Sequence, residues 1–171
     1  RAERTEEARQ DVFALLPRDV TRVDARPEHA EVDTLEGLVN EASIITGAEL
    51  TGPGWRAPID ALVRHSDGTY TPVAVSNHRV ARPLAEGAKS ASALVVDTQN
   101  LGLAEPCEAN YKLRHHAVDS YRLALAARAL NNLGVGSGFG AEIGQDREHA
   151  FLVRIADIMP ILDNALAHPT P

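Results

Sequence analysis

The sequence predicts an α/β domain in which a central mixed β-sheet is flanked by helices. Two segments have apolar residues at helical spacing. Between them lie three runs rich in β-branched residues, and an Asp-Gly turn joins the last two. Of 171 residues, 44% are hydrophobic and only 4% aromatic, so Leu, Val, Ile and Ala must fill the core. We expect one domain over residues 1–171, with its core at about 33–155.

The expected elements follow one another in a regular order. Asp33 and Glu36 have the spacing of a capping box, which predicts that a helix starts at residue 33. We expect helices over 3–16, 33–43, 109–133 and 156–167, strands over 19–25, 43–50, 58–65, 70–79, 141–144 and 149–155, and a loop or short helix over 82–108.

Composition limits the classes of function. The net charge of −7 argues against a broad nucleic-acid-binding surface. Residues 28–51 nevertheless hold six acids and no Lys or Arg, while residues 54–82 hold four Arg against two Asp. An acidic helix beside a basic hairpin suits a site for a metal ion and a phosphate, although chance also produces such clusters.

The cysteine content and the length of the apolar runs predict the cellular compartment. The single cysteine, Cys107, rules out an internal disulfide and a multi-cysteine zinc site, and it suits a reducing compartment. No apolar run approaches the roughly 20 residues of a membrane span. We therefore expect a cytoplasmic protein without a membrane partner. The chain starts at Arg1 without a methionine, which predicts a fragment or a processed product.

The stretch "NEASIITGAEL…APIDALVRHSDGTYTPVAV" resembles the RecB-like exonuclease branch of the PD-(D/E)XK nuclease superfamily. That branch has a helix with a Glu, a strand, a strand with an Asp, and a strand reading Y-x-P-V-E-V-K. The later segment "EIGQDREHAFLVRI" is similar to its last strands. The resemblance implies a restriction-endonuclease-like αβββαβ core and metal-dependent hydrolysis of DNA in repair or processing.

The resemblance implies a site for Mg²⁺ or Mn²⁺, because hard cations prefer oxygen ligands and activate water for attack on a phosphate. Asp60 matches the strand Asp, and Glu41 matches the helix Glu, with Glu36 as the second choice. The third strand departs from the pattern: Ala74 stands in place of the Glu, and Ser76 in place of the Lys.

Two substitutes remain open on the third strand. In one, Asn77 and Arg79 replace the Glu and Lys, since alternate strand residues share a face. In the other, His78 is a metal ligand beside Asp60, which favours Mn²⁺. On the predicted long helix, Lys112, His116 and Asp119 would share one face, from which Lys112 or His116 would supply the missing cation; a solvated helix face is the alternative.

Three functions remain open. The first is a metal-dependent DNA exonuclease, and the second is a catalytically degenerate module of the same fold that binds nucleic acid or a repair partner. The third is a plain α/β scaffold. The expected catalytic residues are Asp60, Glu41, Asn77, His78, Arg79 and Lys112, with Asp60, Glu41 and His78 as metal ligands. The expected nucleic-acid-binding residues are Arg56, Arg64, Arg79, Arg82, Lys112, His116 and Tyr121.

Overall fold

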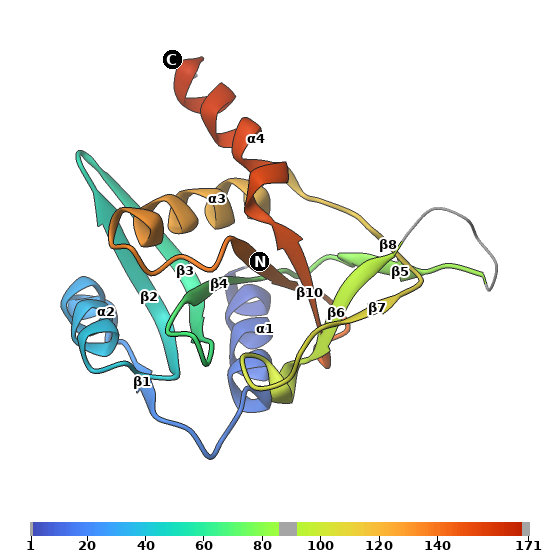
Figure 1. The fold of residues 1–171 in the computed structure, drawn as a ribbon, viewed down its shortest axis with the longest axis horizontal. Coiled ribbons are helices and arrows are strands. Elements are labelled where there is room, and N and C mark those ends of the chain that lie inside the picture. Colours follow the sequence, from blue (N-terminus) through green and yellow to red (C-terminus); the bar gives the residue numbers. More distant parts are fainter. Residues whose placement is uncertain (1, 86–91, 169–171) are drawn as a thin grey trace.

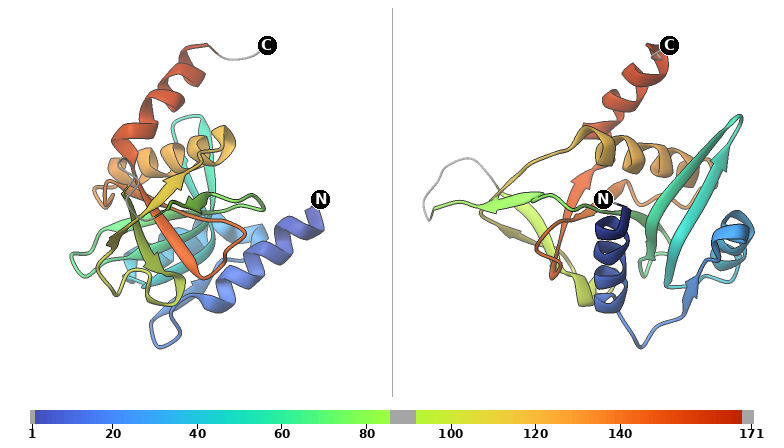
Figure 2. Two further views of the ribbon diagram at one scale, coloured as in Figure 1. Left: turned by 90° about the vertical axis from the view of Figure 1, so that its right-hand side faces the viewer. Right: turned by 180° about the vertical axis from the view of Figure 1, so that it is seen from behind.

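The computed structural model of the chain describes residues 2–85 and 92–168. It confirms the α/β class: a mixed eight-stranded sheet has the strand order β1-β2-β3-β4-β9-β10-β6-β7, and helices lie on both of its faces (Figures 1 and 2). A separate two-stranded sheet, β5 with β8, lies at the end of the molecule away from α2 (Figure 1).

The bounds of the elements are as follows. The helices are α1 (Ala2–Leu15), α2 (Ala30–Val39), α3 (Ala117–Asn132) and α4 (Ile155–Ala167), with short 3₁₀ turns at Pro27–His29 and Thr98–Asn100. The strands are β1 (Arg22–Asp24), β2 (Ile44–Gly52), β3 (Trp55–Arg64), β4 (Tyr70–Val75), β5 (Ala81–Pro83), β6 (Ala93–Asp97), β7 (Cys107–Ala109), β8 (Tyr111–Leu113), β9 (Phe139–Ile143) and β10 (His149–Arg154).

The predicted elements, a helix, three strands, a helix and a strand, occur in that order as α2, β2, β3, β4, α3 and β9, but four further strands, β5 to β8, come between β4 and α3. Strands β2, β3 and β4 form an antiparallel meander. Strand β9 then pairs parallel to β4, and the chain from one to the other includes the crossover helix α3. The turn of the β3–β4 hairpin is the Asp-Gly turn that the sequence predicts, with Gly68 at φ +87°.

Two apolar clusters fill the space between the sheet and its helices. On one face, α3 covers the central strands through side chains such as Leu123. On the other face, α1 covers them through side chains such as Val12. Alternation along β4 sends Ala74 toward α3, while Val73 and Val75 face α1. Both faces of β4 are therefore buried, and a polar group on a central strand must find its partners inside the protein.

The capping-box prediction is wrong. Helix α2 begins at Ala30, after the 3₁₀ turn that Pro27 opens, so Asp33 lies inside the helix. Its carboxylate instead accepts hydrogen bonds from the guanidinium and the backbone N–H of Arg26. Those interactions lower the pKa of Asp33 to about 2. A proline ahead of the helix has fixed its start earlier than the side-chain spacing predicts.

The long helix predicted over 109–133 begins only at Ala117, and residues 111–113 form β8. Here Lys112 is exposed while Tyr111 and Leu113 are half-buried, which is the alternation of a strand. The predicted helical face of Lys112, His116 and Asp119 is therefore wrong. Pairing with β5, a contact remote in sequence, decides the local conformation.

Two other segments also differ from expectation. The strand predicted to reach residue 79 ends at Val75, so the alternation expected for residues 76–79 does not apply. The region 82–108, expected to be a loop or short helix, contains β6, β7 and part of β5 in its described residues. Residues 86–91 of that prediction lie outside the described residues.

Candidate functional site

The candidate site lies at the centre of the sheet, where β3, β4 and β9 run side by side. Ala74 of β4 is paired with Glu142 of β9. On its other side, the pairing of β3 with β4 ends at Ala61 opposite Val73, and Asp60, the next residue of β3, contacts β4 through the backbone N–H of Val75. The alanine at the expected carboxylate position thus stands between two buried acids.

Asp60 is held from both faces of the sheet. Its Oδ2 accepts the backbone N–H of Val75 at 2.7 Å and lies 2.7 Å from Nη2 of Arg122, on α3. Its Oδ1 lies 3.0 Å from Nε of Arg9, on α1, which is an ion-pair distance without the geometry of a hydrogen bond. Only 7% of the Asp60 side chain is exposed, so each carboxylate oxygen faces a guanidinium in a poorly solvated place.

The two arginines extend this contact into a network. Nη1 of Arg9 lies 2.7 Å from Glu6, and Nη1 of Arg122 lies 3.4 Å from Asp119. Removing one partner from a buried ion pair leaves an uncompensated charge, which costs several kcal/mol. A metal ion at Asp60 would therefore have to displace a guanidinium, and this arrangement favours a structural role for Asp60.

Glu142 is the second acid of the row and is almost unpaired. It is 1% exposed, and neither of its carboxylate oxygens has a hydrogen-bond partner among the described residues. Nδ1 of His115 lies 3.6 Å from its Oε2, a contact that becomes an ion pair when the imidazole is protonated. Attraction to the Glu142 carboxylate raises the pKa of His115, and burial of the imidazole opposes that rise only in part.

Further polar atoms without partners lie at the start of α3. Nε2 of His116 and Oγ of Ser120 are buried and accept or donate no hydrogen bond within the described residues. The ring of His116 stacks on His78, with centroids 4.3 Å apart and an angle of 22° between the planes. Buried polar groups without partners are rare in folded proteins and mark places where water or a ligand belongs. Side-chain atoms that can still accept or donate hydrogen bonds are thus concentrated near the end of β4.

Glu41 does not join Asp60. It lies beyond the end of α2 in a left-handed turn, with φ +56°, and 72% of its side chain is exposed. Its Oε1 is 3.8 Å from Nη2 of Arg64, which precedes the turn of the β3–β4 hairpin. Four residues of extended strand, about 13 Å, separate Asp60 from Arg64. The expected pairing of Glu41 with Asp60 is therefore wrong, and Arg64 has an acid partner.

The other expected ligands also stand apart. Nδ2 of Asn77 donates to Thr5 on α1, and His78 is stacked against His116. Across residues 2–85 and 92–168, no three His, Cys, Asp or Glu side chains are grouped so that they could hold a metal ion. The expected metal set of Asp60, Glu41 and His78 is not brought together.

The structure does not bring the expected nucleic-acid-binding residues together on one surface: Arg64 is paired with Glu41, and His116 is stacked on His78. Arg79, Arg82 and Lys112 are exposed on or beside the β5–β8 ribbon, which we define as residues 79–83 and 111–114. Arg56 is exposed on β3, near the β2–β3 turn. Tyr121 is half-buried and packs against the apolar cluster under α3.

Sequence reasoning missed Arg9, Arg122, His115 and Glu142. The sequence does contain a feature that could have identified Glu142, because it is the only acid in the strand "FGAEI". Arg122 is a cation in an otherwise alanine- and leucine-rich helix, which is a weaker signal. Arg9 lies in a highly charged helix, so its pattern gives no sign of a buried partner.

Comparisons with known proteins give no relative. No model of a known protein family matches the chain, and no curated protein matches it either. No helix within the described residues is both long and apolar enough to cross a membrane. Any assignment to a family therefore depends on the residues and geometry above.

Proposed function

We propose that the chain is a catalytically silent module of restriction-endonuclease-like, RecB-like type, and that it binds nucleic acid through the β5–β8 ribbon. Three features support this proposal: the order of elements from α2 to β9, the state of Asp60, and the charge of the ribbon. The third carries the binding function.

Catalytic silence is supported by the central row of residues. A two-carboxylate metal site needs oxygen ligands that are free to coordinate. Asp60 is shared between two guanidiniums and a backbone N–H, and Ala74 has no ligand to offer. Position 76, where the nuclease pattern has a Lys, is Ser76, whose Oγ accepts the backbone N–H of His78.

Binding is supported by a local excess of positive charge. The ribbon and its flanks, residues 77–85 and 109–118, contain four Arg or Lys and no Asp or Glu, in a chain of net charge −7. Arg82 and Lys112 are cross-strand partners and exposed. Within the described residues, Arg82 and Lys112 form no ion pair, and neither do Arg79 and Arg114. Neighbouring uncompensated cations on an exposed ribbon favour a polyanion such as nucleic acid.

The test is the salt dependence of binding to fluorescently labelled DNA, measured by anisotropy. Binding should weaken as salt rises, because each phosphate contact releases counterions and contributes about 0.7 to the logarithmic slope on single strands. The double variant Arg82→Gln/Lys112→Gln should lower the slope by about 1.4. A matched control, Arg18→Gln/Arg154→Gln, removes the same charge from two exposed positions outside the expected binding set and should keep the wild-type slope. Equal losses in both variants would contradict a ribbon-specific site.

A second candidate function, metal-dependent hydrolysis of DNA, is favoured by Glu142. This acid lies in the row of Asp60 and could stand in for the carboxylate missing at Ala74. The test is cleavage of labelled DNA with Mn²⁺, comparing the parent with Asp60→Ala and Glu142→Gln. Activity lost in both variants would support hydrolysis and overturn catalytic silence. An uncleaved substrate, or cleavage that survives both changes, would support silence.

A further inference from the structure

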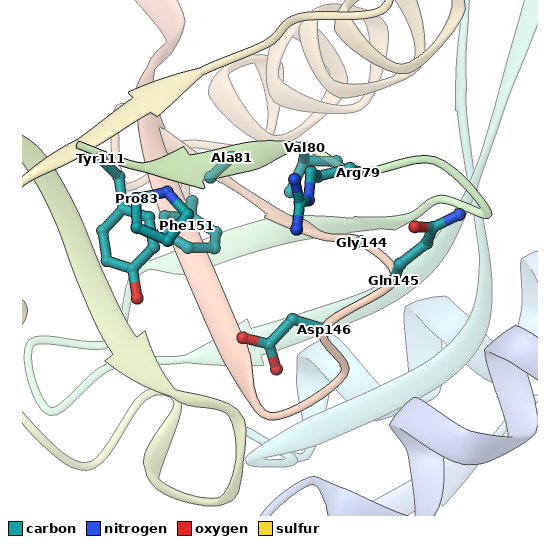
Figure 3. Close-up of a pocket in the computed structure, with 9 residues that line it drawn as sticks. All are labelled: Arg79, Val80, Ala81, Pro83, Tyr111, Gly144, Gln145, Asp146 and Phe151. Carbon is teal, nitrogen blue, oxygen red and sulfur yellow. The ribbon is translucent and has the colours of Figure 1, made fainter. Parts of the chain in front are cut away.

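A pocket opens where the β5–β8 ribbon meets the turn between β9 and β10. Its volume is about 350 Å³, at the lower end of the range for small-ligand sites. Figure 3 shows the rings of Tyr111 and Phe151 together on one side, and the side chains of Arg79 and Asp146 on the other. The pocket is too small for a duplex and large enough for one unstacked base.

The aromatic side of the pocket offers a surface for stacking. Tyr111 and Phe151 meet edge to face, with centroids 5.0 Å apart and planes at 68°. Phe151 is 3% exposed and belongs to a buried apolar cluster, whereas Tyr111 is half-buried. The buried ring thus fixes the orientation of the partly exposed one. A tyrosine ring held in this way is a suitable platform for a nucleobase.

The polar side of the pocket separates positive from negative charge. Arg79 is exposed and makes no ion pair within the described residues, so its guanidinium is free for a phosphate. Asp146 is fixed in place: Oδ1 accepts the backbone N–H of Glu148 at 3.1 Å, and Oδ2 lies 2.6 Å from Nδ1 of His149. A carboxylate repels phosphate but accepts hydrogen bonds from a base amino group.

We propose that this pocket receives a single unpaired base of a nucleic-acid strand, with the base on Tyr111, its amino group toward Asp146 and its phosphate on Arg79. The inference depends on the proposed function, because the ribbon supplies the general attraction to the strand. Cytosine presents an exocyclic amine to Asp146, whereas thymine presents a carbonyl oxygen at the same position. The pocket therefore discriminates between these two pyrimidines and between single strands and duplexes.

The experiment measures anisotropy of labelled oligo-dC, oligo-dT and duplex DNA, each of about 12 nucleotides. Oligo-dC should bind the parent most tightly. Tyr111→Leu should weaken binding of oligo-dC about 5- to 100-fold and leave duplex binding unchanged, since it removes the stacking face. Tyr111→Phe keeps that face and should bind as the parent does. Asp146→Asn should reduce the preference for oligo-dC over oligo-dT. Thermal unfolding of each variant confirms that it is folded.

The outcomes separate the two proposals. If Tyr111→Leu binds oligo-dC as the parent does, while Arg82→Gln/Lys112→Gln loses affinity for all DNA, the base pocket is refuted and the ribbon proposal stands. Equal affinity of the parent for oligo-dC, oligo-dT and duplex refutes the pocket in the same way. If the parent binds none of the three, the proposed function fails, and the pocket inference fails with it.

Discussion

Replacing Asp60 by asparagine tests whether its carboxylate is a structural ion partner. The change keeps the size of the side chain and a hydrogen-bond acceptor for Val75, but it removes the charge between Arg9 and Arg122. Two guanidiniums would then face each other across a site where the wild-type side chain is 7% exposed. We expect Asp60→Asn to destabilise the fold.

The magnitude follows from burial and from the remaining partners. Breaking a fully buried pair costs about 3–5 kcal/mol. The side chains of Arg9 and Arg122 are 27% and 28% exposed, and each has another acid nearby, so we expect about 2–4 kcal/mol here. With a slope of about 2 kcal/mol per molar urea, the unfolding midpoint should fall by roughly 1–2 M.

The assay is urea unfolding at neutral pH, with Asp33→Asn as the matched control. Asp33 also pairs with an arginine, but the side chain of that partner, Arg26, is 65% exposed. We therefore expect a clearly smaller loss in the control. Catalytic carboxylates often destabilise the fold that holds them, so a more stable Asp60→Asn variant would refute the structural role and favour the nuclease alternative.

Three further predictions concern neighbouring residues. Glu142 and, to a smaller extent, Asp157 raise the pKa of His115 in the folded state, so the contribution of His115 to stability is complete below about pH 6.5 and is lost as pH rises through the raised value. Urea unfolding across this range should show the loss, and Glu142→Gln should remove most of it. Gly144→Ala should cost about 1–3 kcal/mol in chemical unfolding, because a Cβ there would lie 2.6 Å from a carbonyl oxygen of the segment after β4; a neutral result would show that this segment yields. Tyr70→Phe should cost about 1–2 kcal/mol in the same assay by leaving the carbonyl of Ala42 without its 2.7 Å hydrogen bond, and an unchanged midpoint would contradict that estimate.

The sequence predicted those elements whose signals are local. The Asp-Gly turn fixed the β3–β4 hairpin, and the alternation around it placed Asp60 on a strand at the centre of the sheet. Helix α3 was placed correctly from Ala117 onward, where alanine and leucine dominate. The ribbon was missed because β5 and β8 are each three residues long and owe their conformation to each other.

The candidate site was predicted less well than the fold because the residues that contact one another there are remote in sequence. Arg9 and Arg122 meet at Asp60 only after α1 and α3 have packed on opposite faces of the sheet. Glu142 reaches the row of Asp60 through the parallel pairing of β4 with β9, a register that side-chain spacing does not reveal. Glu41 was misplaced because the helix was expected to continue beyond its end at Val39.

The two outer strands of the large sheet, β1 and β7, are both only three residues long. Each has few free backbone N–H and C=O groups with which a strand of another molecule could pair. Strand β1 additionally carries the charged side chains Arg22 and Asp24. Short, charged margins of this kind hinder the strand addition that leads to fibrils and to sheet-extended dimers. We therefore expect strand addition to be hindered at β1 and β7. Because β1 covers only residues 44–46 of β2, any strand addition should occur at residues 48–52 of β2.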